Sequence, residues 1–228
     1  MRGRGGMVPP MNLRKIHPIR ECPLCGTGNP KPYFEDKFRP YFQCTHCQLV
    51  FVPSSHWLGP EEEKAVYDLH VNDPGDEGYR RFLSRLTLPL LEKLDSRCRG
   101  LDFGCGPGPA LAAMVEEGGH AMDLFDPVYF PRDLAEPYDF ITATEVVEHF
   151  RHPAKEFNTL FALLKPGGWL GLMTKQVLNQ RAFAQWHYIR DLTHICFYSP
   201  PTFEYLADRF NAHLTFVGKD VILMQRKN

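Results

Sequence analysis

An eight-residue stretch at 101–108, Leu-Asp-Phe-Gly-Cys-Gly-Pro-Gly, constrains this chain more than any other part of the sequence. It begins with the apolar character of a buried strand, and an acid, Asp102, lies at the strand's carboxyl end. Three alternating glycines then let backbone N–H groups approach a ligand closely, and a helical pattern follows at 109–117. A strand, a glycine loop and a helix in this order predict a nucleotide-type cradle.

A dinucleotide-binding fold also begins with a strand, Gly-x-Gly and a helix, so this stretch alone does not identify the kind of nucleotide-binding fold. Motifs farther along the chain distinguish the alternatives. Here the third glycine comes too early, and Pro109 follows it. Residues 120–126 (HAMDLFD) predict a second strand that ends in an acid. A further strand opens at 138–141 and runs into TEVVEHF at 144–150, and a helix then leads to Leu-Lys-Pro-Gly-Gly at 164–168.

This order of motifs closely resembles the class I S-adenosylmethionine-dependent methyltransferases, in particular the branch that includes the ubiquinone-biosynthesis O-methyltransferases. The resemblance covers roughly residues 78–228. It implies an α/β fold, namely a Rossmann-like sheet with helices on both faces, closed by an antiparallel hairpin at 213–217 and 220–225. It also implies that the cofactor is S-adenosyl-L-methionine.

The cofactor-binding residues follow from the resemblance, motif by motif. Asp102 would either orient the methionine ammonium or cap the loop, and both roles remain open. Asp126 would hold the ribose hydroxyls, and Phe125 is a candidate to stack on the adenine. Only eleven residues, 127–137, precede the next strand, too few for the helix, third strand and adenine-reading loop of a full-length relative. The implied set is Asp102, Gly104, Cys105, Gly106, Gly108, Phe125, Asp126, Thr144 and Glu145.

Two Cys-x-x-Cys pairs, Cys22/Cys25 and Cys44/Cys47, stand eighteen residues apart. This spacing matches a zinc ribbon, in which each pair forms one knuckle of a tetrahedral thiolate site. A closed shell of four cysteines leaves zinc no open position for substrate, so the predicted metal is structural. Two disulfides or unrelated thiols are the alternative, although the seven cysteines fit a reducing compartment better than a disulfide framework.

Composition and pattern divide the chain into four parts. A basic tail is predicted to be disordered over 1–20, and the zinc ribbon covers 21–55. A linker and packing helices follow at 56–98, and the methyltransferase domain occupies 99–228. Within that domain, 175–199 is rich in aromatics, histidines and amides where the chain leaves the carboxyl end of a parallel strand, so it is the expected acceptor cap.

Candidate catalytic groups gather in and around this cap: His149, His187, Tyr188, Asp191 and His194. Methyl transfer mainly requires alignment of donor and acceptor, with a base where the acceptor must lose a proton. Histidine suits that role because its reference pKa, about 6.5, lies near working pH. His194 is favoured as base or anchor ahead of His149 and His187, since a similar Thr-His pair follows the cap in many relatives. Asp191 would orient either ring.

A second metal site is an open alternative at Glu145, Glu148 and His149. Two carboxylates and an imidazole at helical positions i, i+3 and i+4 can face one way, and some related methyltransferases hold a divalent ion with a similar motif. The competing interpretation is that these residues cap a helix and form the floor of the cofactor site.

Charge and hydropathy narrow the classes of function. With 26 basic and 27 acidic residues, the chain has no global attraction to nucleic acid, and it has neither a signal-peptide-like start nor a run of about 18 apolar residues. We therefore expect a cytoplasmic methyltransferase that acts on a small molecule, such as a hydroxylated aromatic, a sugar or a biosynthetic intermediate. An RNA methyltransferase is the alternative, because a zinc ribbon precedes similar domains in bacterial rRNA enzymes. A non-catalytic scaffold, whose ribbon binds a protein partner, is the third hypothesis.

Overall fold

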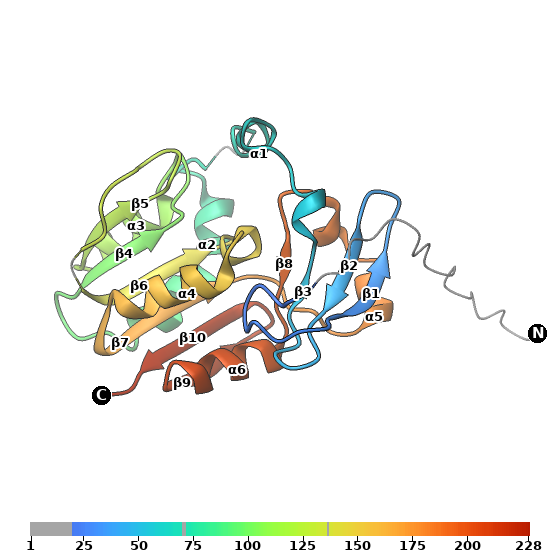
Figure 1. The fold of residues 1–228 in the computed structure, drawn as a ribbon. Helices are drawn as coiled ribbons and strands as arrows, with labels where there is room; N and C mark the ends of the chain where they lie inside the picture. Colours follow the sequence, from blue (N-terminus) through green and yellow to red (C-terminus); the bar gives the residue numbers. More distant parts are fainter. Residues whose placement is uncertain (1–19, 70–71, 136) are drawn as a thin grey trace, which may run out of the picture.

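The computed structural model describes residues 20–69, 72–135 and 137–228, which form one six-stranded and one four-stranded sheet (Figure 1). Apart from Arg20, the tail predicted at 1–20 lies outside the described residues. None of the helices in the described ranges is long and apolar enough to cross a bilayer.

The larger sheet is parallel over four strands and antiparallel at one end. In spatial order its strands are β5 (Ala121–Phe125), β4 (Arg99–Phe103), β6 (Tyr138–Thr144), β7 (Leu164–Met173), β10 (Val221–Arg226) and β9 (Ala212–Val217). Strands β5, β4, β6 and β7 are parallel, and β10 pairs antiparallel with both β7 and β9. This order confirms the predicted α/β sheet and its closing hairpin.

Two pairs of helices cover the two faces of this sheet (Figure 1). They are α2 (Glu77–Leu91) with α3 (Ala110–Glu117), and α4 (Pro153–Ala162) with α6 (Pro200–Arg209). Successive side chains of a strand point to opposite faces, and β10 follows this rule. Val221 and Leu223 join the core under α2 and α3, while Ile222 and Met224 join the core under α4 and α6.

The sheet ends at β5, because the chain after Asp126 is too short to add another strand. Among the described residues between β5 and β6, the pairing is limited to an isolated bridge between Asp126 and Phe130. This agrees with the limit that the eleven residues at 127–137 impose on the sequence.

The smaller sheet joins the cysteine-containing segment to the predicted acceptor cap. Its strands, in order, are β1 (Lys31–Glu35), β2 (Pro40–Gln43), β3 (Val50–Phe51) and β8 (Cys196–Phe197). β8 comes from the cap and pairs antiparallel with β3. The buried rings of Tyr41, Phe183 and Phe197 contact one another edge to face, so one aromatic core spans both segments.

Short elements connect these layers and line the site. They are η2 (Ser54–His56), α1 (Pro60–Tyr67), η3 (Val147–His149), α5 (Gln180–Phe183) and η4 (His187–Arg190). Helix α1 lies above the carboxyl end of the larger sheet in Figure 1. η3 follows β6 directly, so its side chains lie at that same end of the sheet.

Candidate active site

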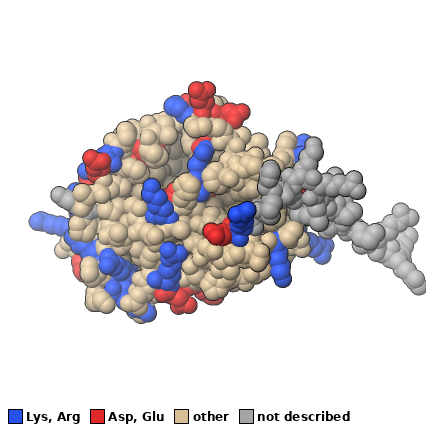
Figure 2. All heavy atoms as spheres, viewed as in Figure 1, with Lys and Arg blue, Asp and Glu red and all other residues tan. Residues whose placement is uncertain are grey.

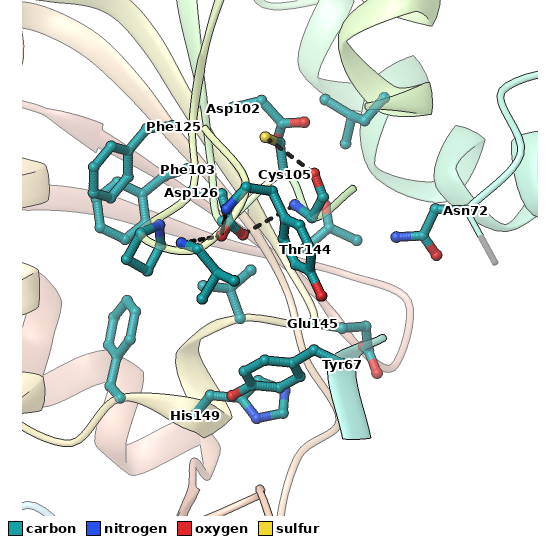
Figure 3. Close-up of a pocket in the computed structure, with 18 of the residues that line it drawn as sticks. Tyr67, Asn72, Asp102, Phe103, Cys105, Phe125, Asp126, Thr144, Glu145 and His149 are labelled. Atoms are coloured by element: carbon teal, nitrogen blue, oxygen red, sulfur yellow. Dashed lines mark hydrogen bonds between the residues drawn. The ribbon is translucent and has the colours of Figure 1, made fainter. Parts of the chain in front are cut away.

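A cavity of about 910 Å³ opens at the carboxyl ends of β4, β5 and β6. Figure 3 shows Asp102 and Cys105 toward one end of it and Tyr67, Glu145 and His149 toward the other. The glycine loop forms the first end, and η3, α1 and the cap form the second. Ligands of open α/β sheets bind at this position, outside the carboxyl ends of parallel strands.

Glycine is required at two positions of the loop for reasons of space. A Cβ on Gly104 would lie 2.6 Å from the side chain of Val146, and the backbone φ of Gly104 is +77°. A Cβ on Gly108 would lie 1.9 Å from the carbonyl oxygen of Asn72. The loop is therefore packed closely between β6 and the segment that follows α1, and any larger residue would push these walls apart.

Asp126 ties the loop to the chain that follows β5. One carboxylate oxygen accepts the Gly106 N–H at 3.1 Å, and the other accepts the N–H groups of Val128 and Tyr129 at 2.8 and 3.0 Å (Figure 3). An ionised carboxylate has roughly four acceptor positions. Asp126 therefore organises the turn and keeps acceptor capacity at the cavity wall.

Asp102 is a buried acid beneath the loop. The hydroxyl of Thr142 donates to its carboxylate at 2.8 Å. Burial raises the pKa of Asp102 to about 7, and the nearby charge of Asp126 adds to the shift. Burial likewise raises the pKa of the Cys105 thiol to about 12, which makes that thiol a weak nucleophile at neutral pH.

Three buried oxygens near the end of β6 have no hydrogen-bond partner among the described residues: Thr144 Oγ1, Glu145 Oε1 and Glu148 Oε2. Glu145 stands at φ +52°, an unusual conformation for a side-chain-bearing residue. Burial raises the pKa of Glu145 to about 6, and burial together with the charge of Glu145 raises that of Glu148 to about 8. Thr144 and Glu145 line the cavity, so their oxygens fit a ligand that is cationic or rich in donors.

Two histidines face each other across the acceptor end of the cavity. Their ring centroids are 4.8 Å apart. His149 Nδ1 lies 3.1 Å from the carbonyl oxygen of Thr193, and His194 Nδ1 lies 2.8 Å from that of Tyr188. A carbonyl can only accept, so each ring carries a proton on Nδ1, and the neutral His194 ring has its Nε2 as an acceptor. Burial, reinforced by His149, lowers the pKa of His194 to about 3.

Two other predicted catalytic residues, Asp191 and His187, line the cavity in different surroundings. Asp191 accepts from the backbone and hydroxyl of Thr193 at 2.9 and 2.6 Å and lies 3.7 Å from His194 Nε2. Burial opposes ionisation of Asp191, but the Thr193 hydrogen bonds lower its pKa. His187 is exposed at the rim, where the Lys175 ammonium donates to its Nε2 at 2.8 Å.

Tyr188 lines the cavity, but its hydroxyl is committed elsewhere. That hydroxyl donates to the buried carboxylate of Glu148 and lies 3.1 Å from the hydroxyl of Thr174. Burial, strengthened by the charge of Glu148, raises the pKa of Tyr188. The structure therefore brings His149, His194 and Asp191 together and gives Tyr188 the part of a neutral hydrogen-bond donor.

The alternative metal set is changed by the local backbone. The helical spacing expected for Glu145, Glu148 and His149 does not occur, because Glu145 follows β6 directly with positive φ and η3 is a single turn. Instead, potential ligand atoms of Glu148, His149 and His194 all lie within 4.8 Å of one another. These three residues have the donor types that could hold a divalent ion.

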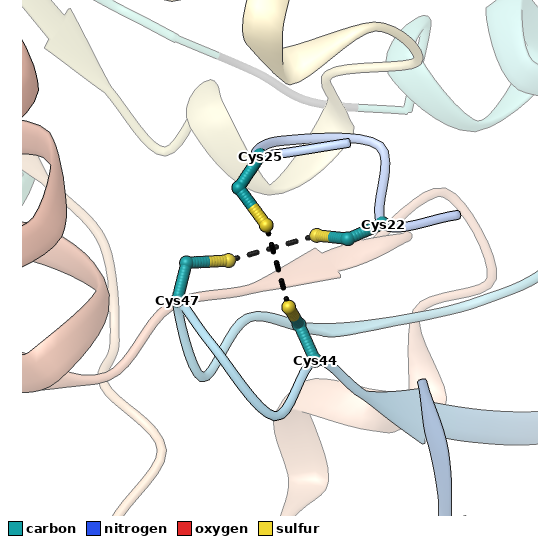
Figure 4. A group of neighbouring side chains, drawn as sticks. All are labelled: Cys22, Cys25, Cys44 and Cys47. Carbon is teal, nitrogen blue, oxygen red and sulfur yellow. Dashed lines mark hydrogen bonds between the residues drawn. The ribbon is translucent and has the colours of Figure 1, made fainter. Parts of the chain in front are cut away.

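The four cysteines of the paired motifs converge on one point (Figure 4). The sulfurs of Cys22 and Cys47 are 3.6 Å apart, and those of Cys25 and Cys44 are 3.4 Å apart. Four thiolates around zinc, each about 2.3 Å from it, would be roughly 3.8 Å apart, whereas a disulfide would bring two sulfurs to about 2.05 Å. The spacing therefore fits a tetrahedral metal site and excludes the disulfide alternative in this structure.

The backbone around the cluster is also suited to metal-bound thiolates. The N–H groups of Leu24 and His46 point at cysteine sulfurs, each at 3.4 Å, as in a supported thiolate knuckle. His46, inside the second knuckle, is exposed and lies outside the set of four cysteines.

Sequence reasoning missed two residues that shape the cavity, Tyr67 and Asn72. The Tyr67 ring packs edge to face on His149 with centroids 5.4 Å apart, and its hydroxyl donates to Glu63 at 2.9 Å. Asn72 covers Gly108 from the other side of the loop. Neither position carries a motif, because each acts on residues far away in the sequence.

Fold and site together define a class I methyltransferase fold with a shortened sheet edge. The chain belongs to the methyltransferase domain family, whose model matches residues 76–215. Among solved structures, the same fold occurs in the 1,6-didemethyltoxoflavin-N1-methyltransferase of Burkholderia thailandensis. That structure contains bound 1,6-didemethyltoxoflavin and S-adenosylhomocysteine. Its TM-score is 0.53 at 15% identity, over 87% of this chain and 100% of that chain.

Two curated relatives are named ubiquinone biosynthesis O-methyltransferase. The protein of Leptothrix cholodnii is 29% identical over 147 residues, which cover 52% of this chain and 57% of the relative. The protein of Colwellia psychrerythraea is 25% identical over 142 residues, which cover 60% of this chain and 55% of the relative. The chain thus spans little more than half the length of these relatives.

Our first prediction concerns the metal. Protein purified without added metal should contain one zinc per chain, and Cys47→Ser should lose it, because thiolate binding supplies about 10–16 kcal/mol of folding free energy in comparable sites. Elemental analysis measures the zinc, and limited proteolysis over 20–55 reports whether the segment opens on chelation. His46→Ala, in the same knuckle, is the control that should keep the metal. Unchanged protease resistance in metal-free protein would contradict the assignment.

Proposed function

We propose that this protein transfers the methyl group of S-adenosyl-L-methionine to a small-molecule acceptor. The observation that carries the proposal is that one cavity contains both the glycine loop and the His149–His194 pair. Its volume of about 910 Å³ is at the upper end of the range of roughly 300–1,000 Å³ found for ligand pockets, enough for a cofactor and a small acceptor.

The cofactor end has residues suited to each part of S-adenosyl-L-methionine. Backbone N–H groups of the glycine loop and the Asp102 carboxylate would hold the methionine moiety, while Asp126 would hold the ribose. Phe125 packs on Phe103 with centroids 4.9 Å apart and would support the adenine. When bound, the cofactor supplies an activated methyl on a sulfonium, so the chain's task is alignment.

At the acceptor end, His194 is suited to anchor a hydroxyl group. Its Nε2 can accept a hydrogen bond from the hydroxyl group of the acceptor. Because the pKa of His194 is about 3, however, the ring is a weak base at neutral pH. His149, in ring contact with it, is the second candidate for proton removal. The names of the curated relatives support oxygen as the methylated atom.

The distribution of charge favours a small acceptor over RNA. On the face shown in Figure 2, basic and acidic side chains both occur, without a continuous basic surface. The cap adds histidines and aromatic rings to the cavity instead of a basic stripe, as in pockets for small molecules. We further propose the cytoplasm as its compartment, since zinc-binding thiols must stay reduced.

Asp126→Ala should weaken the binding of both S-adenosyl-L-methionine and S-adenosylhomocysteine. The change removes charge-assisted hydrogen bonds worth about 1.5–3 kcal/mol each. Titration calorimetry measures the two affinities. Asp123→Ala, on β5 three residues earlier and outside the cavity lining, is the matched control. Unchanged affinity in the Asp126 variant would reject its role in cofactor binding.

Cofactor affinity should rise as the pH increases from 6 to 8. Folding raises the pKa of Asp102 from 3.8 to about 7, so this acid is largely neutral below pH 7 and becomes a partner for the methionine ammonium only above it. The effect can approach about tenfold per pH unit below the pKa. Asp102→Asn should flatten the pH dependence. An identical pH profile in the two proteins would argue for a purely structural Asp102.

His194→Ala should lower the single-turnover rate by about 10²-fold while leaving cofactor affinity intact, because the loss concerns acceptor alignment. The rate would be measured with an acceptor found by comparing metabolites of cells with and without the protein. His149→Ala tests the second ring, and His187→Ala at the rim is the control. Normal turnover by His194→Ala, or loss of activity only through unfolding, would make His194 structural.

A further inference from the structure

We propose that Arg39, in the four-cysteine segment, is a positioning residue for the acceptor site. This inference rests on the proposed function, because it assigns Arg39 the task of holding the backbone that orients His149 and His194. Arg39 is only 2% exposed, although arginine is rarely buried to this degree without specific partners. It directly precedes β2, more than a hundred residues before the cap.

The Arg39 guanidinium donates to three carbonyl groups of the cap. Nη1 donates to Leu192 at 2.8 Å, and Nη2 donates to Asp191 at 2.9 Å and Ile189 at 3.3 Å. Nε donates to the hydroxyl of Tyr41 at 3.0 Å. Most of its five N–H groups are thus used, and three of these bonds hold the backbone from η4 into the turn that follows it.

The neighbouring carbonyls of the same turn hold the two histidines. Tyr188 accepts from His194 Nδ1, and Thr193 lies within hydrogen-bond distance of His149 Nδ1. The carbonyls bound to Arg39 therefore lie between the two that fix the histidine tautomers. A shift of this stretch of backbone would move both rings, and a misplacement of about 1 Å can cost 10²-fold in rate.

The segment after His194 is held by the same cysteine-containing unit. The N–H of Val52 donates to the carbonyl of Ile195 at 2.9 Å, and β3 then pairs with β8. The N–H of Ile195 donates in turn to the carbonyl of Glu148 at 2.8 Å. His194 is therefore bracketed by Arg39 on one side and by β3 on the other, so the four-cysteine segment is part of the acceptor site's framework.

Lysine cannot replace Arg39 in this arrangement. Its single ammonium has three donors at one point, whereas the observed acceptors are spread around a planar fork. Asp36 fixes the turn that carries Arg39, because its carboxylate accepts from the backbone N–H of Arg39 at 2.8 Å and from the Tyr41 hydroxyl at 2.9 Å. The contacts with the cap therefore depend on the shape of the guanidinium as well as on its charge.

The test compares Arg39→Lys and Arg39→Gln with Lys37→Gln, which changes an exposed cation on the same turn whose ammonium lies over the ring of Phe38. Hydrogen exchange followed by mass spectrometry is measured on peptides covering 187–198 and, separately, 40–52. In both Arg39 variants, amides of 191–195 should exchange at least about 10-fold faster, while 40–52 stays protected and zinc content is unchanged. Lys37→Gln should match the wild type.

Kinetics complete the test once an acceptor is available. Both Arg39 variants should lose about 10-fold or more in kcat, with KM for S-adenosyl-L-methionine within about twofold of wild type, because the cofactor end is untouched. Wild-type exchange at 191–195, or equal opening of 40–52, would overturn the positioning role, as would full activity in Arg39→Lys. Faster exchange at 191–195 in protein that binds no cofactor would instead overturn the proposed function and leave the positioning contact standing.

Discussion

The pairing of β3 with β8 is the constraint on which the acceptor side of this molecule depends. It joins the segment that carries the cysteines to a strand near the other end of the chain. Closing so long a loop costs conformational entropy, and the two-residue strands form too few hydrogen bonds to offset it alone. The surrounding aromatic core provides the missing stabilisation, since Tyr41 and Phe197 are almost fully buried in it. The small sheet and the cap therefore stabilise each other.

A second constraint is the group of acids at and behind the cavity. Asp102 and Glu145 line the cavity, Glu148 is fully buried and does not line it, and burial raises the pKa of each. A cationic ligand lowers the cost of ionising them, and the sulfonium and ammonium groups of S-adenosyl-L-methionine are such cations. These acids therefore have opposite effects on stability and on binding. In the unfolded chain each acid has a pKa near 4, so above that pH the raised pKa in the folded protein lowers the free energy of unfolding. Carboxylates that weaken the free protein are those best placed to attract the ligand.

Sequence reasoning reached the large sheet because its signals are local. A strand, a glycine loop and a helix lie within 101–117, and the crowding by Val146 and Asn72 explains why glycine recurs there. The cysteine pairs were equally readable, since two knuckles at ribbon spacing leave few geometries open. The shortened segment at 127–137 even indicated the missing strand, because eleven residues cannot form a helix and a strand with their turns.

What the sequence could not provide depends on contacts between distant segments. The helical spacing assumed for Glu145, Glu148 and His149 failed because the backbone at Glu145 leaves the α region, and no residue type announces a positive φ at a glutamate. Arg39 carried no signal at all, because a lone arginine in a turn is ordinarily a solvated charge. Its meaning arises only when folding brings three cap carbonyls within reach of one guanidinium. The role of a side chain such as Arg39 is set by the backbone carbonyl groups to which it donates, and those carbonyl groups belong to another part of the chain.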